Sequence, residues 1–147
     1  MVGLSLQVEM NHSDIIGEWI IRRNIEDKLN KRNFILNGKA IFTTEDNIFY
    51  YKETGVIKSD NFESKAHQDY TWIIKPNGWK INFSDGSHFH DLELENNKQE
   101  VYHNCGNDIY RGRFKLNIPK EYEVIWNVSG PHKNYISHTC YNREIRI

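Results

Sequence analysis

The sequence contains few cysteines, few prolines and no long apolar run. Two cysteines and three prolines occur in 147 residues. Two cysteines fit a reducing compartment at least as well as a single disulfide, so we expect a cytoplasmic protein. No apolar run approaches the ~18 residues that a membrane-spanning helix requires, and residues 1–11 lack the pattern of a signal peptide. The sequence therefore predicts no association with a membrane.

Clustered positive charge is also missing. The chain has 19 basic and 20 acidic residues and a net charge of −1, with no long basic stripe. Because proteins that bind nucleic acids present a concentrated basic surface, we expect no nucleic-acid partner. The sequence has no Walker loop, no Gly-x-Gly-x-x-Gly motif and no Ser-His-Asp order of catalytic residues. These absences argue against phosphoryl transfer and dinucleotide binding.

Aromatic residues are abundant, at 13% of the chain. They favour strands and supply large core side chains. Apolar and polar residues alternate in about ten short segments, and no amphipathic helix longer than two turns is evident. The expected strands cover residues 15–25, 34–44, 48–53, 62–74, 79–83, 88–94, 99–105, 107–116, 122–128 and 135–145.

Short connections between these segments predict that sequence neighbours pair antiparallel. A meander of this size closes most naturally into a barrel, because closure removes exposed strand edges. We therefore predict an all-β fold. It is a single antiparallel up-and-down β-barrel of eight to ten strands, forming one domain over residues 1–147, with a short irregular segment at Met1–Asp14.

The strongest functional signal lies between Gly86 and Gly106. A two-residue turn at Asn96 and Asn97 would place His90 opposite His103, and His88 opposite Cys105. Period-2 alternation then gives one inward face and one mostly acidic or polar outward face. The expected inward residues are His88, His90, Leu92, Leu94, Val101, His103 and Cys105.

Three interpretations of this His and Cys cluster are open. The side chains of His88, His90 and His103, with Cys105 as a fourth ligand, have the chemistry of a zinc site. The same imidazoles would also serve as hydrogen-bonding groups of a polar ligand pocket without a metal. In the third interpretation they are core histidines that are satisfied internally. The pattern singles out no particular cofactor.

Further candidate residues accompany the cluster. Asp108 and Tyr110 share a face on the following strand and could orient an imidazole or act as acid and base. Arg23 shares the face of Trp19 and is a candidate anion anchor inside the barrel, and Lys133 follows Gly130-Pro131 at the expected mouth. Tyr70 and Trp72 are in phase on one strand and are expected to form part of the pocket wall.

Two groups of residues carry a resemblance to known families. Gly17-Glu18-Trp19 and a late Arg143 resemble the Gly-x-Trp signature and closing arginine of the lipocalin-like barrels, the calycins. The resemblance implies that Trp19 and Arg143 contact each other at one end of a closed barrel. A fuller pattern, from Gly17-Glu18-Trp19 to Tyr141-x-Arg143, resembles a small uncharacterised family, a domain of unknown function. That resemblance implies no activity.

These observations favour a cytoplasmic barrel that binds a small, partly polar molecule. The predicted ligand-binding residues are Arg23, Tyr70, Trp72, His88, His90, His103, Asp108, Tyr110 and Lys133. The alternative is an enzyme that uses the same pocket, through metal-assisted hydrolysis or His/Asp/Tyr acid–base chemistry. A third possibility is an interaction module whose interior is filled by its own side chains.

Overall fold

The computed structural model describes residues 10–143, which form ten antiparallel strands after one short 3₁₀ turn, η1 (His12–Ile15). The strands are β1 (Gly17–Asp27), β2 (Arg32–Glu45), β3 (Ile48–Ser59), β4 (Phe62–Lys75), β5 (Gly78–Phe83), β6 (His88–Glu93), β7 (Lys98–Cys105), β8 (Asp108–Asn117), β9 (Glu121–Ser129) and β10 (Asn134–Asn142). Residues 1–9 of the predicted irregular segment Met1–Asp14 lie outside this range, as do residues 144–145 of the last predicted strand. No helix within residues 10–143 is long and apolar enough to cross a membrane.

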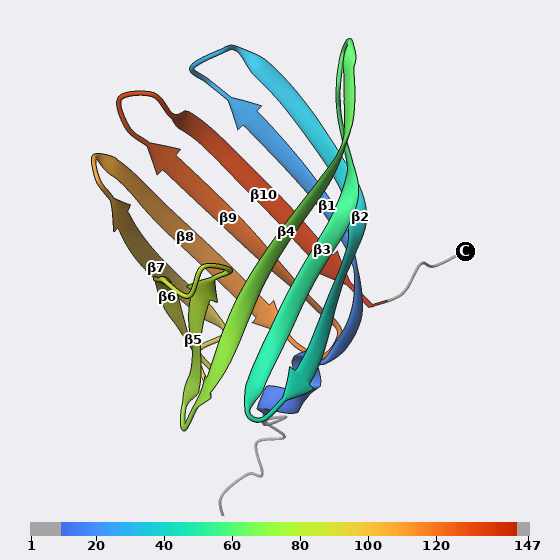
Figure 1. Ribbon diagram of the computed structural model, residues 1–147, viewed down its shortest axis with the longest axis vertical. Helices are drawn as coiled ribbons and strands as arrows, with labels where there is room; N and C mark the ends of the chain where they lie inside the picture. Colours follow the sequence, from blue (N-terminus) through green and yellow to red (C-terminus); the bar gives the residue numbers. More distant parts are fainter. Residues whose placement is uncertain (1–9, 144–147) are drawn as a thin grey trace, which may run out of the picture.

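The strands form a single sheet in the order β6-β5-β4-β3-β2-β1-β10-β9-β8-β7. Sequence neighbours pair along each half, and the ladder between β1 and β10 joins the two halves. The sheet curls until its two edges, β6 and β7, come side by side (Figure 1). This arrangement is a nearly closed up-and-down barrel and confirms the predicted fold class.

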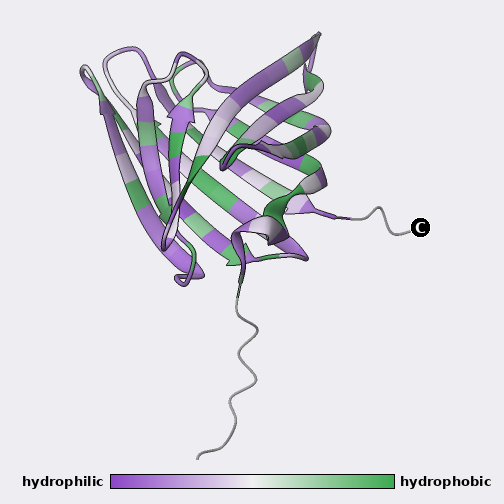
Figure 2. Ribbon diagram, turned by 60° about the horizontal axis from the view of Figure 1, so that its bottom comes forward, coloured by the Kyte–Doolittle hydropathy of each residue, from purple (hydrophilic) through white to green (hydrophobic). Residues whose placement is uncertain are grey.

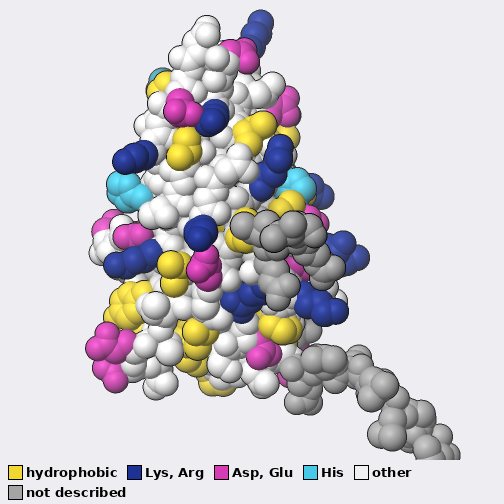
Figure 3. Space-filling view, turned by 90° about the vertical axis from the view of Figure 1, so that its right-hand side faces the viewer, with side chains coloured by type: hydrophobic (Ala, Val, Ile, Leu, Met, Phe, Trp, Pro, Cys, Tyr) yellow, Lys and Arg dark blue, Asp and Glu magenta, His cyan; other side chains and the backbone are white. Residues whose placement is uncertain are grey.

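Alternation along the strands separates the interior from the surface. Hydrophobic and hydrophilic residues follow each other in short bands along the ribbons (Figure 2). In β1, for example, Trp19 and Ile21 are buried while Glu18 and Arg22 are exposed. On the side of the barrel that lies to the right in Figure 1, charged side chains of both signs surround scattered hydrophobic ones (Figure 3). One face of each strand therefore builds the interior, as period-2 alternation requires.

One end of the barrel is closed by Trp19 and Arg143. The Arg143 guanidinium lies over the Trp19 ring, 3.7 Å from its centroid. It also donates hydrogen bonds to the carbonyl oxygens of Asp14, Glu18 and Pro119. The Trp19 indole N–H donates to the carbonyl oxygen of Ile15 in η1 at 2.9 Å. The predicted contact between Trp19 and Arg143 is confirmed.

The predicted hairpin ladder between residues 88 and 105 is wrong. β6 pairs with β5 and β7 pairs with β8, while the two strands share no ladder. We call the gap between β6 and β7 the seam. The Gln99 side chain bridges it near the connecting loop, because its amide oxygen accepts from the Glu93 N–H and its amide nitrogen donates to the Glu93 carbonyl, both at 2.8 Å. The Gln99 side chain thus makes the pair of hydrogen bonds that a neighbouring strand would otherwise make with the Glu93 backbone.

A register shift in the β5–β6 ladder changes which residues of β6 face inward. Ile81 pairs with His90, but Asn82 pairs with His88, so Phe89 is an extra residue. Such a bulge turns two consecutive side chains toward the same side. Phe89 and His90 are both buried, whereas His88 is exposed. The predicted inward direction of His88 and outward direction of Phe89 are therefore both wrong.

Candidate functional site

The barrel encloses a cavity of about 510 Å³. Its lining reaches Asn30 and His132, which lie in the β1–β2 and β9–β10 turns at the upper end in Figure 1. Both of these residues are exposed, so the cavity opens at that end. The opposite end is closed by Trp19 and η1. The geometry is that of a cup with one mouth, a common form of ligand site in small β-barrels.

A buried ion pair forms one side of the cavity. Arg23 on β1 donates from Nη1 and Nη2 to the two carboxylate oxygens of Glu53 on β3, at 2.7 and 2.8 Å. Its Nε donates to the Thr139 hydroxyl at 2.6 Å. Glu53 is only 2% exposed. Burial alone would lower the pKa of Arg23, but the hydrogen bonds and charge of Glu53 outweigh burial and raise it. Arg23 therefore stays charged, with its charge balanced by Glu53.

Tyrosine hydroxyls extend this network. Tyr51 donates to Glu53 Oε1 at 2.5 Å, and its oxygen is 2.9 Å from the Tyr141 hydroxyl oxygen. Because Tyr51 gives its proton to the carboxylate, Tyr141 must donate to Tyr51. Burial raises the pKa of Tyr51 and Tyr141, so both remain protonated donors. We call Arg23, Tyr51, Glu53, Thr139 and Tyr141 the polar wall.

Two buried donors beside the polar wall are unsatisfied. The Tyr122 ring stacks on Tyr141 with centroids 3.9 Å apart, yet its hydroxyl has no hydrogen-bond partner among residues 10–143. The indole Nε1 of Trp72 is also buried without a partner in this part of the chain. Both side chains line the cavity. Both atoms are inaccessible to water, and an unsatisfied buried polar group costs about 1–3 kcal/mol, so the surrounding packing must offset this cost.

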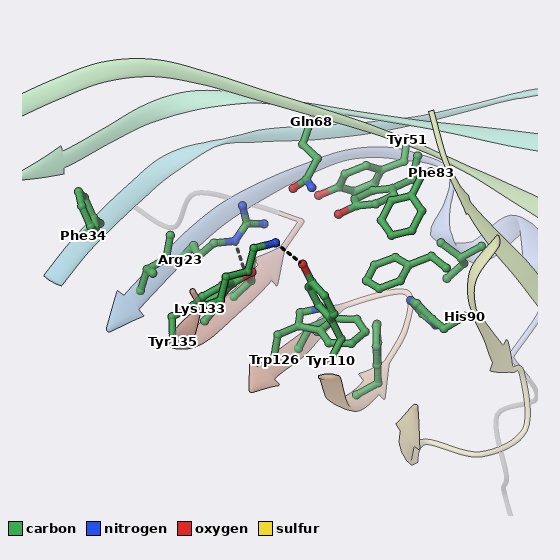
Figure 4. Close-up of a pocket in the computed structure, with 18 of the residues that line it drawn as sticks. Arg23, Phe34, Tyr51, Gln68, Phe83, His90, Tyr110, Trp126, Lys133 and Tyr135 are labelled. Atoms are coloured by element: carbon green, nitrogen blue, oxygen red, sulfur yellow. Dashed lines mark hydrogen bonds between the residues drawn. The ribbon is translucent and has the colours of Figure 1, made fainter. Parts of the chain in front are cut away.

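The cavity is also lined by an aromatic wall of Tyr70, Phe83, Phe89, His90 and Trp126. Figure 4 shows Phe83, His90 and Trp126 of this wall. Phe89 is at its centre. The Phe89 ring is nearly parallel to Trp126 at 4.8 Å, to Phe83 at 4.4 Å and to Tyr70 at 5.8 Å between centroids. Gly112 leaves room for Trp126, because a Cβ at that glycine would lie 2.7 Å from the indole ring. The bulge in β6 thus places a flat aromatic surface beside the seam.

The imidazole of His90 is kept uncharged by its surroundings in the aromatic wall. Burial lowers its pKa to about 4, although the Asp91 carbonyl opposes part of this effect. Nδ1 lies 3.3 Å from that carbonyl oxygen and must be its donor. In the neutral ring Nε2 is then the hydrogen-bond acceptor. A neutral His90 fits an aromatic environment.

Lys133 stands at the mouth of the cavity. Its Nζ donates to the Tyr110 hydroxyl at 3.0 Å (Figure 4) and lies 3.5 Å from the Asp108 carboxylate. The hydrogen bond to Tyr110 raises the pKa of Lys133. Gly130 allows Asp108 to approach, since a Cβ there would lie 1.9 Å from a carboxylate oxygen. A cation held over a tyrosine ring thus marks one edge of the mouth.

The structure brings together six of the nine predicted ligand-binding residues. Those that line the cavity are Arg23, Tyr70, Trp72, His90, Tyr110 and Lys133. Of the other three, His88 lies on the outer surface with Nε2 3.0 Å from Asp91, and Asp108 contacts Lys133 at the mouth. His103 is half-buried and packs against the rings of Phe83, Phe89 and Tyr110.

The predicted cluster of three histidines and a cysteine does not form. His90 and His103 do not face each other directly, because Phe89 contacts both rings, at 4.7 and 5.2 Å between centroids. Cys105 is exposed, since it ends β7 at the rim and pairs with Asp108 beside the turn. Within residues 10–143 the only group with three potential metal ligands close together is Glu123, His138 and Cys140.

Sequence reasoning missed most of the polar wall. The alternation predicts a strand that ends at Glu53, whereas β3 continues to Ser59 and buries the carboxylate opposite Arg23. The alternation does indicate that Glu53 is buried, because Glu53 is in phase with Phe49 and Tyr51, which are both buried. Tyr141 and Thr139 are likewise in phase with each other on β10. A charged residue in phase with buried aromatics predicts a buried ion pair.

Several solved structures have a similar barrel. The S-type phycobiliprotein lyase CPES from Guillardia theta has a TM-score of 0.60 at 11% identity, over 92% of this chain and 91% of that one. The redesigned β-barrel mFAP1, bound to DFHBI, has a TM-score of 0.49 at 12% identity, over 89% and 96%. A fluorescence-activating β-barrel designed de novo has a TM-score of 0.47 at 12% identity, over 93% and 100%. At 11% identity the match to the lyase shows the fold alone.

Sequence comparison gives a family without an assigned activity. No curated protein matches the chain. Residues 15–143 match the model of a family of unknown function, DUF6314, a span that includes both Trp19 and Arg143. The chain therefore belongs to the DUF6314 family.

Proposed function

We propose that the protein binds a small, flat and partly polar molecule inside the barrel. The observation that carries this proposal is the 510 Å³ cavity, which joins an aromatic wall to a wall of buried hydrogen-bonding groups. An interior filled by its own side chains would have no such space. Cavities of several hundred Å³ with an apolar lining and a few oriented polar groups are typical of small-molecule sites.

The chemistry of the two walls narrows the ligand. An aromatic or conjugated ring system fits the aromatic wall, where flat side chains already stack nearly parallel to Phe89. The hydrogen-bonding groups of the polar wall favour a ligand with a polar group at one end. Because Glu53 already balances Arg23, the polar end of the ligand is neutral rather than anionic.

Two further points support binding rather than turnover. Asp108, Tyr110 and His90 do not converge as an acid–base set, because Asp108 is held by Lys133 at the mouth and His90 lies in the aromatic wall. A histidine with a pKa of about 4 is also a weak base at neutral pH. A phycobiliprotein lyase has a similar fold. For the present chain we propose that a flat ligand binds inside the barrel and that binding takes place in the cytoplasm.

A titration with the neutral, flat aromatic dye 6-propionyl-2-(dimethylamino)naphthalene, which carries a carbonyl group at one end, tests the proposal. We expect saturable enhancement of dye fluorescence with one site per chain. Ser137 on β10 is buried and lines the cavity, so the ring of Ser137→Phe should occupy part of the space and weaken binding at least tenfold. Ile136→Phe, on the outward side of the same strand, is the matched control and should bind as the unaltered protein does.

Circular dichroism of all three proteins checks that the barrel is intact. The proposal is wrong if the folded, unaltered protein does not bind the dye. It is equally wrong if Ser137→Phe folds and binds the dye with unchanged affinity, because the binding would then take place on the outer surface.

A further inference from the structure

A second group of chemically reactive side chains lies outside the cavity, on the outer face of β9 and β10. Glu123 pairs directly with Cys140 in the ladder between these strands, and His138 precedes Cys140 by two residues. Their strand neighbours Val124, Thr139 and Tyr141 are buried in the interior. By alternation, Glu123, His138 and Cys140 therefore project from the opposite side of the sheet.

The ligand atoms of these three residues already lie close together. His138 Nε2 is 3.1 Å from Glu123 Oε2 and 3.8 Å from Cys140 Sγ. All three atoms lie within 4.8 Å of one another. Zinc binds carboxylate oxygen, imidazole nitrogen and thiolate sulfur at about 2.0, 2.0 and 2.3 Å, so a tetrahedral site separates neighbouring ligand atoms by roughly 3.3–3.5 Å. The observed distances bracket this separation.

We propose that Glu123, His138 and Cys140 form a zinc site on the outside of the barrel. Three protein ligands leave a fourth position for water, as in sites that keep an open coordination position. Oxygen, nitrogen and sulfur donors together select zinc over calcium or magnesium, which prefer oxygen alone. The site is independent of the ligand cavity, because the sheet separates the two.

Charge and rigidity support the site. Binding releases the Cys140 thiol proton to water, and the resulting thiolate and the Glu123 carboxylate balance the two charges of the ion. Burial and the Glu123 carboxylate raise the pKa of the free Cys140 thiol, and Arg22, which pairs with it from β1, opposes only part of this effect, so the ion itself displaces the proton. The three residues lie in the regular ladder of two long strands and are half-buried. Little backbone ordering is therefore required on binding.

Cobalt titration of the full chain tests the proposal, since cobalt reports a thiolate ligand by a near-ultraviolet charge-transfer band. We expect the band to saturate at one equivalent and to disappear when one equivalent of zinc is added. Cys140→Ser should abolish the band, whereas Cys105→Ser, at the exposed cysteine of β7, should retain it. Zinc should also raise the melting temperature of the unaltered protein but not that of Cys140→Ser.

A second variant keeps the test decisive if Cys140→Ser folds poorly. His138→Ala preserves the thiol and should weaken zinc binding at least tenfold. The proposal is overturned if the unaltered protein gives no thiolate band. It is also overturned if the band survives in folded Cys140→Ser and is lost in Cys105→Ser, or if His138→Ala binds zinc with unchanged affinity.

Discussion

The polar wall and the aromatic wall face the same cavity but are held in place differently. The polar wall lies on β1, β3 and β10, in the continuous part of the sheet where each strand is hydrogen-bonded on both sides. Its members are joined to one another by hydrogen bonds of 2.5–2.9 Å. The aromatic wall reaches β6 at the seam, where Phe89 and His90 are held by ring packing rather than by a second ladder.

The two walls therefore differ in how far their side chains can move. A buried, fully paired polar network fixes the orientation of its donors and tolerates little change. Side chains beside an unpaired strand edge can move with that edge, because fewer backbone hydrogen bonds restrain it. We therefore expect the polar wall to orient a ligand and the aromatic wall to adapt to its shape.

The largest effect is expected from breaking the ion pair of the polar wall. Glu53→Gln removes the carboxylate but keeps its shape, which leaves the buried Arg23 charge without a partner. Loss of one member of a buried pair costs about 3–5 kcal/mol in the free energy of unfolding, measurable by urea denaturation. Replacing both members, with Arg23→Met and Glu53→Leu together, should restore most of the lost stability. Equal destabilisation by the single and double variants would contradict this account.

An effect of intermediate size is expected from the pH dependence of His90. The folded pKa is about 4 against the usual 6.5, so the unfolded chain binds more protons between these values. The stabilisation is present above pH 6.5 and is lost as the pH falls toward 4. The pKa difference corresponds to a loss of order 3 kcal/mol. His90→Gln should therefore reduce the pH dependence of unfolding over this range.

His88 provides the matched control on the same strand. His88→Gln changes an exposed imidazole on the outer surface and should leave the loss of stability caused by His90 in place. If the two variants show the same pH profile, burial of His90 does not determine its titration.

The smallest effect is expected at the seam itself. Gln99→Ala removes the two hydrogen bonds to the Glu93 backbone and should cost about 1 kcal/mol, because the bridge is exposed to water. Hydrogen exchange of the Glu93 amide should become faster, whereas the amides of β1 should not change. Lys98→Ala, the preceding exposed position, serves as the control. Unchanged exchange at Glu93 would show that the seam is closed by other contacts.

The parts of the fold set by local alternation could be predicted from the sequence. The strands, the meander and the contact of Trp19 with Arg143 depend on patterns within each strand and on a resemblance between families. Five of the predicted ligand-binding residues line the cavity for the same reason, since they lie on inward phases of regular strands or at the mouth beside them, and the sixth, His90, lies next to the bulge of β6.

The errors concern features that only the closed barrel determines. Alternation cannot show that β6 and β7 are edges, because a short connection with two asparagines is equally compatible with a hairpin. The bulge at Phe89 depends on the register between β5 and β6, and one extra residue reverses the direction of His88. The pairing of Arg23 with Glu53 spans β1 and β3, which are separated by β2 in the sheet.

The ladder between β1 and β10 has a consequence for how fast the chain folds. It pairs Asp27 with Tyr135 and Ile20 with Asn142, segments from opposite ends of the described chain, whereas the other ladders join sequence neighbours. Local hairpins form in microseconds, but closure of such a long loop carries a large entropic cost before any contact offsets it. We therefore expect substitutions along β1 and β10 to slow folding, and substitutions beside the seam to speed unfolding.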